Sequence, residues 1–181
     1  MTEIRIAEPG DLPALVASLG HEYFFTNHLG YQANGRGELF VAWDGPTPVG
    51  DVYLWRDRPH EPEVFQHLSW TPTLMHLEVA VAYQNRGIGT ALIRAVEQHA
   101  SALGYVQLCL GVGVNNAGAR RLYERLGYVE WKHGLVVARW ESPGPDGVLV
   151  PDSETCHWLV RTLRGEAPGA ALSVATGTGP P

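Results

Sequence analysis

The feature that most restricts the fold is a largely apolar run that ends in a glycine-containing turn and continues as an amphipathic helix. Leu74 to Val81 has the composition of a buried strand, and the turn Tyr83 to Gly89 follows it. Gly104 stands where a helix would end. Apolar residues recur at helical spacing before it, at Ile88, Ala91, Leu92, Ala95, Val96 and Leu103. This order predicts a strand, a tight turn and a helix in one unit.

A second unit of the same kind follows directly. Val106 to Val112 is predicted as a strand, and Gly127 as the end of the next helix. One face of that helix carries Ala119, Leu122, Tyr123 and Leu126. Two strand-to-helix units in series favour a parallel pair of strands at the centre of a sheet.

The flanking segments predict further strands and one early helix. Ile4 to Ile6 alternates like a strand, and Asp11 is typical of a helix N-cap. Four longer runs are β-prone: Leu39 to Trp43, Val49 to Trp55, Val129 to Trp140 and Thr155 to Leu163. The first two would form an antiparallel hairpin and the last two would complete the sheet. We therefore expect an α/β fold with a mixed sheet.

Three stretches are predicted as connections. His21 to Gly37 mixes aromatic and polar residues with glycines, a pattern that could form a short helix followed by a mobile loop and does not by itself determine the structure. Arg56 to Pro72 shows no period and is expected to be a connection beside a substrate cleft. Ser142 to Asp152 is rich in turn-forming residues and is expected to be the loop of the last hairpin.

Length and composition fit one domain. The chain has 181 residues, of which 45% are hydrophobic and 18% charged, as in a globular protein that buries its own core. Beyond Gly165 the sequence consists mainly of Gly, Ala, Pro, Ser and Thr, which bury little surface. We expect one domain over residues 1–165 and a flexible C-terminal tail over residues 166–181.

Charge and cysteine content argue against several classes of function. The chain has 13 Lys and Arg against 19 Asp and Glu, a formal charge of −6, which disfavours nucleic-acid binding. Cys109 and Cys156 lack metal-binding spacing, so no metal is expected. No apolar stretch approaches the roughly 20 residues that cross a bilayer, and the start resembles no signal peptide. We expect a cytoplasmic protein that acts on a small partner rather than on a membrane.

The turn between the first strand and helix has the composition of an anion-binding site. Glycines let backbone N–H groups approach a phosphate, and the start of a helix adds a partial positive charge. A P-loop would need a Gly-Lys pair, but the only lysine is Lys132. A dinucleotide motif would need a third glycine after Gly87 and Gly89. The turn therefore predicts a diphosphate site of another type.

Two motifs in this region resemble those of the GNAT acetyltransferase family. Gln84-Asn85-Arg86-Gly87-Ile88-Gly89 matches the family pattern (Arg/Gln)xxGx(Gly/Ala) after a buried strand. The second motif, from Asn116 to Tyr128, follows at the expected distance. The resemblance is specific over about residues 74–128. It implies a mostly antiparallel central sheet with a splayed parallel pair, flanked by helices.

The resemblance also implies acetyl-CoA as cofactor and an N-acetyltransferase activity. In the family, the strand before the turn leaves backbone groups free to bind the pantetheine arm, and the turn binds the pyrophosphate. The cofactor-binding residues that it implies are Val79, Ala80, Val81, Gln84, Asn85, Arg86, Gly87, Ile88, Gly89, Thr90, Ala91, Asn116, Ala119 and Tyr123. Asn116 could instead serve only as a helix N-cap.

Acyl transfer to an amine needs one group that accepts a proton and one that donates a proton. The resemblance places Tyr123 near the CoA sulfur as the acid, although its apolar helix face would also suit a packing role. Glu78 is the leading candidate for the base because it interrupts an apolar strand. His76 shares its face by alternation and is the rival. Ordered water is the third alternative.

The acceptor is expected to be a primary amine of a small molecule or peptide. Residues that could line its pocket, or that could simply pack in the core, are Glu22, Tyr23, Phe24, Phe25, His28 and Asp51. A non-catalytic acyl-CoA-binding module with the same fold is the alternative function. The sequence leaves a monomer and a homodimer equally open.

Overall fold

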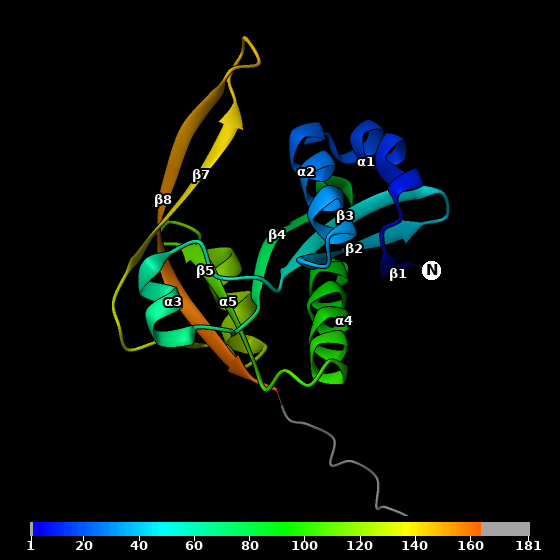
Figure 1. Ribbon diagram of the computed structural model, residues 1–181. Helices are drawn as coiled ribbons and strands as arrows, with labels where there is room; N and C mark the ends of the chain where they lie inside the picture. The colour runs from blue at the N-terminus through cyan, green and yellow to red at the C-terminus, as the bar shows by residue number, and fades with distance from the viewer. Residues whose placement is uncertain (1, 164–181) are drawn as a thin grey trace, which may run out of the picture.

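The computed structural model describes residues 2–163, so the predicted tail over residues 166–181 lies outside the described part. Within it, eight strands form one sheet in the order β1-β2-β3-β4-β5-β8-β6, and β7 pairs with β8 (Figure 1). Neighbouring strands are antiparallel except β4 and β5, which are parallel. The predicted mixed α/β sheet is confirmed.

The N-terminal part of the sheet contains β1 (Glu3–Ile6), β2 (Gly37–Asp44) and β3 (Thr47–Trp55). The predicted hairpin is thus present as β2 and β3. A 3-10 turn (Pro9–Asp11) and helix α1 (Leu12–Leu19) follow β1. The helix expected within His21 to Gly37 is present as α2 (Glu22–Ala33) and leaves only a short connection to β2; Phe25 and Leu29 lie one turn apart in it and are both buried.

The connection before the central strands contains a helix that periodicity did not predict. Helix α3 (Pro62–Leu68) starts at a proline, whose fixed φ suits the first helical position. Its buried Val64 packs with Cys109, Val136 and Trp158. Tertiary contact, rather than a repeating apolar pattern, therefore holds this short helix in place.

Both predicted strand-to-helix units are present. The first consists of β4 (Thr73–Val79), a 3-10 turn (Val81–Tyr83) and α4 (Ile88–Ala102), so the strand ends at Val79 rather than Val81. The second consists of β5 (Gln107–Gly113) and α5 (Ala117–Arg125). None of the helices within residues 2–163 has the length and apolar character needed to span a membrane.

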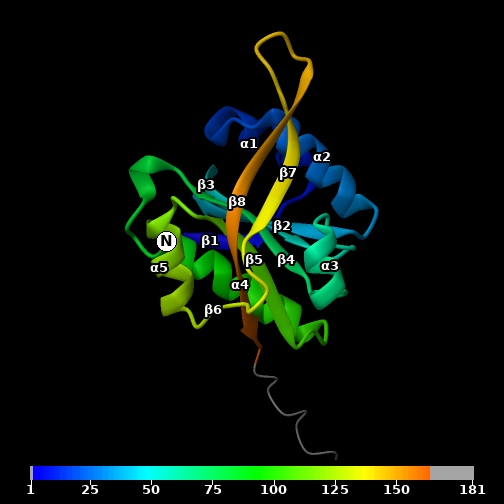
Figure 2. The ribbon, with the colours of Figure 1, turned by 90° about the vertical axis from the view of Figure 1, so that its left-hand side faces the viewer.

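The predicted strand Val129 to Trp140 is divided into two, with residues 131–135 outside any strand, and the last strand begins earlier than predicted. The chain continues through β6 (Val129–Glu130), β7 (Val136–Pro143) and β8 (Leu149–Thr162). Most of the expected loop belongs to β7 and β8, whose pairing reaches Pro143 opposite Leu149. The resulting hairpin projects beyond the body of the protein (Figures 1 and 2).

Helices cover both faces of the sheet. On one face, α4 and α5 pack on the largest buried cluster, which includes Leu92, Val96, Leu110, Tyr123 and Leu159. On the other face, α1 and α2 cover β1 to β3, and α3 covers β5 and β8. The sheet is thus the middle layer, with α4 and α5 on one face and α1, α2 and α3 on the other.

Candidate active site

The central parallel strands diverge almost as soon as they meet. The one pair in register between β4 and β5 is Thr73 with Cys109, whose N–H donates to the Pro72 carbonyl at 3.0 Å. Farther along, β4 stays paired with β3, and β5 stays paired with β8. The edge of β4 that faces β5 is therefore left without a neighbouring strand over most of its length. A cavity of about 320 Å³ lies in this gap.

Residues from both faces of the sheet line this cavity. Asn116, Ala119 and Tyr123 come from the α5 side. The opposite side contributes Trp55, His60, Glu61, Glu154 and Trp158. Side chains from both faces of the sheet thus surround one cavity in the gap between β4 and β5.

The turn before α4 leaves several backbone N–H groups free. Gly87 caps the helix with φ 81°, a left-handed conformation that favours glycine, and Asn85 has φ 60°. Within residues 2–163, no hydrogen-bond acceptor is found for the N–H groups of residues 85 to 90. A Cβ built on Gly87 meets no atom within 4 Å, so the space above the turn is open. Free N–H groups at a helix start suit an anionic ligand.

The residues around this turn that were predicted to bind the cofactor differ in their contacts and exposure. The Gln84 amide donates to the Val79 carbonyl at 3.0 Å and ties the turn to the end of β4. The Arg86 guanidinium lies 5.0 Å from the Tyr83 ring centroid, at the surface. Val81 is 85% exposed, outside the strand that was predicted to include it. The structure thus brings Arg86 and the free N–H groups to one surface.

Asn116 and Tyr123 are placed by α5. The Asn116 side chain accepts a hydrogen bond from the Ala119 N–H at 3.1 Å, so it caps the helix and also faces the cavity. Tyr123 is 8% exposed and lines the same cavity. Burial raises the pKa of its phenol to about 12, so the hydroxyl is protonated at neutral pH. Tyr123 therefore presents a proton donor at the gap between the strands.

A bulge in β4 places His76. Asp51 lies opposite Glu78, whereas Tyr53 lies opposite Met75, so β4 has one residue more than β3 in this stretch. His76 has φ 54°, which is uncommon for a residue other than glycine. No residue pattern in the sequence predicted this bulge, and the simple alternation expected for β4 does not hold here.

His76 is held by a buried carboxylate. Its Nδ1 lies 2.9 Å from Oδ1 of Asp51, which is fully buried, and its ring stacks on Phe24 with centroids 3.8 Å apart. Burial lowers the pKa of His76, but the hydrogen bond and the charge of Asp51 outweigh it, so the pKa is raised. Burial raises the pKa of the Asp51 carboxyl against the influence of His76. His76 lines the cavity.

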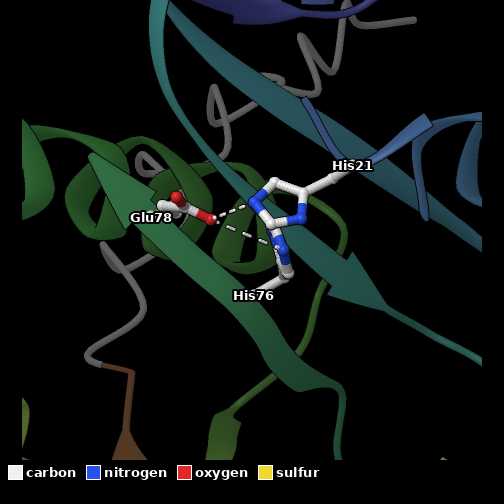
Figure 3. A group of neighbouring side chains, drawn as sticks. All are labelled: His21, His76 and Glu78. Carbon is white, nitrogen blue, oxygen red and sulfur yellow. Dashed lines mark ion pairs between the residues drawn. The ribbon is translucent and has the colours of Figure 1, made fainter. Parts of the chain in front are cut away.

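Glu78 lies on the same side of β4 as His76 but nearer to solvent. Its side chain is 43% exposed, and its Oε2 lies 3.0 Å from Nε2 of His21 and 3.7 Å from Nε2 of His76 (Figure 3). Glu78 is not among the cavity-lining residues in the described part of the chain. The contact with His21, at the start of α2, had no signal in the sequence.

The six predicted acceptor residues do not form one pocket. Phe24 stacks on both His76 and His28, and Phe25 is fully buried in the core. Burial lowers the pKa of His28 to about 4. Glu22 and Tyr23 lie at the surface of α2. The side chains that do line the cavity on this face, such as Glu61 and Trp158, were not predicted because distant segments bring them together.

Comparison with known proteins agrees with this geometry. The model of the acetyltransferase (GNAT) family matches residues 7–128. A mouse protein named "Probable N-acetyltransferase family 8 member 5" is 33% identical over 97 residues, which are 52% of this chain and 40% of the relative. The chain thus spans about two fifths of the length of that curated relative.

Solved structures share the fold. The ribosomal-protein-S18-alanine N-acetyltransferase of Escherichia coli has a TM-score of 0.64 at 23% identity, over 94% of this chain and 99% of that chain. A GNAT family acetyltransferase from Elizabethkingia anophelis with acetyl-CoA bound has a TM-score of 0.59 at 20% identity, over 90% and 98% of the two chains. With the family match across both motifs, these findings confirm the predicted family and fold: the chain belongs to the acetyltransferase (GNAT) family.

Proposed function

We propose that the protein transfers an acetyl group from acetyl-CoA to a primary amine. The observation that carries the proposal is the gap between β4 and β5, where a cavity, an unpaired strand edge and the Tyr123 phenol meet. The family membership and the acetyl-CoA bound to a structural neighbour support the choice of donor.

The residues present suit a CoA-type ligand. The free N–H groups of residues 85 to 90, with Arg86 beside them, would bind its diphosphate. The free edge of β4 between Leu74 and Val79 would bind an extended arm that carries amide groups. Open space at Gly87 leaves room for such a ligand. Bound acetyl-CoA would supply the acetyl group as a reactive thioester.

The amine would reach the cavity from the face opposite α5. Glu61 and Glu154 are the carboxylates that line this side, and Trp55 and Trp158 add aromatic surface. Among the residues described, no Lys or Arg lines the cavity. Carboxylates and aromatic rings attract a cationic amine, so this side is proposed as the acceptor site.

Tyr123 and His76 are the proposed proton-handling groups. Tyr123 holds its proton at neutral pH and would donate it to the leaving thiolate. His76 would accept the proton of the amine, because it lines the cavity and Asp51 fixes its ring. Oε2 of Glu78 lies 3.7 Å from Nε2 of His76, and Glu78 is the second candidate for this role. A proton that leaves through water would bypass both side chains.

A thiol-release assay with acetyl-CoA tests the proposal. Purified protein is offered a panel of diamines, amino acids, aminoglycosides and peptides with free N-termini, and free CoA is measured with a thiol reagent. Amine-dependent thiol release, together with the acetylated product by mass spectrometry, is expected for at least one class. Tight CoA binding without any acetylated product would instead support a non-catalytic acyl-CoA-binding module.

A further inference from the structure

The start of α2 and the middle of β4 bring two imidazoles and a carboxylate together. One ligand atom from each of His21, His76 and Glu78 lies within 4.8 Å of the other two. Figure 3 shows both rings turned toward the Glu78 carboxylate. The pairs that involve Glu78 are 3.0 Å and 3.7 Å apart. The three groups therefore converge on one point.

The two contacts of Glu78 have distances close to those between ligand atoms of a tetrahedral metal site. Metal bonds of about 2.0–2.2 Å to nitrogen and oxygen ligands place the ligand atoms roughly 3.3 Å apart in such a site. The two measured contacts of Glu78 lie on either side of that value. The side chains of His21 and Glu78 are 44% and 43% exposed, so both can adjust and an ion can reach them from solvent.

His76 is held by neighbouring side chains in the way that metal-binding histidines usually are. Asp51 contacts Nδ1 of His76 at 2.9 Å and leaves Nε2 pointing toward Glu78. A carboxylate on the far ring nitrogen fixes the orientation of a metal-bound histidine and raises its basicity. The Phe24 ring, stacked at 3.8 Å, holds the imidazole from the side. His76 is thus oriented before any ion arrives.

Two of these residues, His21 and His76, have an unusual left-handed backbone conformation. His21 has φ 51° and His76 has φ 54°, and within the described residues Asn85 is the only other non-glycine with a positive φ. Such conformations cost free energy and persist where the surrounding structure holds them. The imidazoles of both residues point toward Glu78 (Figure 3).

We propose that His21, His76 and Glu78 form a binding site for a divalent transition-metal ion of the Zn²⁺ class, and that the bound ion blocks acetyl transfer. Two imidazoles and one carboxylate favour Zn²⁺, Co²⁺ or Ni²⁺ over Mg²⁺ or Ca²⁺, which prefer oxygen ligands. The ion would occupy Nε2 of His76, the ring nitrogen that Asp51 leaves free and that would otherwise accept the proton of the amine. Metal binding depends on geometry alone, whereas the block of transfer rests on the proposed function.

Titration of the EDTA-treated protein with Co²⁺ tests the binding. One Co²⁺ per chain is expected, with the intense visible absorption of a tetrahedral ion, and Zn²⁺ should displace it. The substitution His21→Asn removes one ligand and keeps a residue that tolerates a left-handed backbone. It should weaken Co²⁺ affinity at least about tenfold, the lower end of what loss of ligand support costs. His133→Gln, at an exposed loop histidine, is the control and should bind as the wild type does.

Thiol release measured with Zn²⁺ and then with excess EDTA tests the block. Wild-type activity should fall with Zn²⁺ and return with EDTA, whereas His21→Asn should be active in EDTA and resist the same Zn²⁺ concentration. Equal Co²⁺ affinity of wild type and His21→Asn, or the absence of a stoichiometric site, would overturn the metal site. Zn²⁺ bound at the site without loss of activity would overturn the block. The Co²⁺ titration needs no acetyl-CoA, so it remains decisive even if no amine is acetylated.

Discussion

The two neighbours of β5 are joined to it in opposite ways. On one side, β8 pairs with β5 from Gln107 opposite Thr162 to Gly113 opposite Cys156. On the other side, β4 meets β5 at Thr73 and Cys109 and then turns away. We call the β5–β8 boundary, which is paired along its length, the closed join, and the β4–β5 boundary, where the strands diverge, the open join. The open join leaves a cavity and an unpaired strand edge. We infer that the closed join supplies stability and the open join supplies binding.

The largest expected effect follows from closing the anion site beside the open join. Gly89→Glu would add a negative charge in the first turn of α4, where the diphosphate is proposed to bind. Like charges about 4 Å apart repel by about 4 kcal/mol near a protein surface, so CoA affinity should fall by roughly a thousandfold. Isothermal titration with CoA measures it. Gly30→Glu, at an exposed position in α2, should bind CoA normally; unchanged binding by Gly89→Glu would move the diphosphate elsewhere.

A cavity in the closed join should cost stability rather than binding. Leu159 of β8 is fully buried and lies opposite Leu110. Leu159→Ala should lower the free energy of unfolding by about 3 kcal/mol, as measured by urea denaturation. The CoA affinity of the folded variant should stay within about twofold of the wild type if the two joins are independent. A large loss of affinity would show that they are coupled.

Removal of the Tyr123 hydroxyl at the open join should lower turnover without changing CoA affinity. Tyr123→Phe deletes the proposed proton donor and keeps the ring, so kcat should fall by about 100-fold with CoA affinity unchanged. Tyr128→Phe is a matched control, because Tyr128 belongs to the same buried cluster and its hydroxyl is buried, but the residue does not line the cavity. Full turnover by Tyr123→Phe would assign the proton to water.

The smallest expected effect lies outside both joins, in α2. Burial lowers the pKa of His28 to about 4 in the folded chain, against about 6.5 when unfolded. Below pH 6.5 the unfolded chain therefore binds the proton and the folded chain does not, so stability falls as the pH falls toward 4. The loss between pH 7 and pH 5 should reach up to about 2 kcal/mol. Urea denaturation of His28→Leu at both pH values should show a correspondingly smaller difference.

The sequence predicted the parts of the site that depend on local chemistry. The turn at Gly87 and the cap at Asn116 are short motifs whose residue types dictate their backbone, and both form as expected. The order of strands and helices around them follows from hydrophobic periodicity. The resemblance to the family then assigned a function to the two motifs, which hydrophobic periodicity alone cannot do.

What the sequence did not predict depends on contacts between distant segments. The bulge at His76 arises from the register of β4 against β3, and the Asp51 partner comes from that neighbouring strand. The outer end of the β7–β8 hairpin, Ser142 to Asp152, was expected to be a loop, but cross-strand pairing extends the two strands through Pro143 and Pro151. No local signal marks such pairings in a single sequence.

Hydrogen exchange with and without CoA tests the central claim most directly. If CoA binds at the open join, peptides that cover Leu74 to Val79 and residues 85 to 90 should gain protection, since their free N–H groups acquire acceptors. Peptides from the part of β8 that pairs with β5 should exchange as before. Protection confined to other segments, with β4 and the turn unchanged, would contradict the assignment of the open join as the cofactor site.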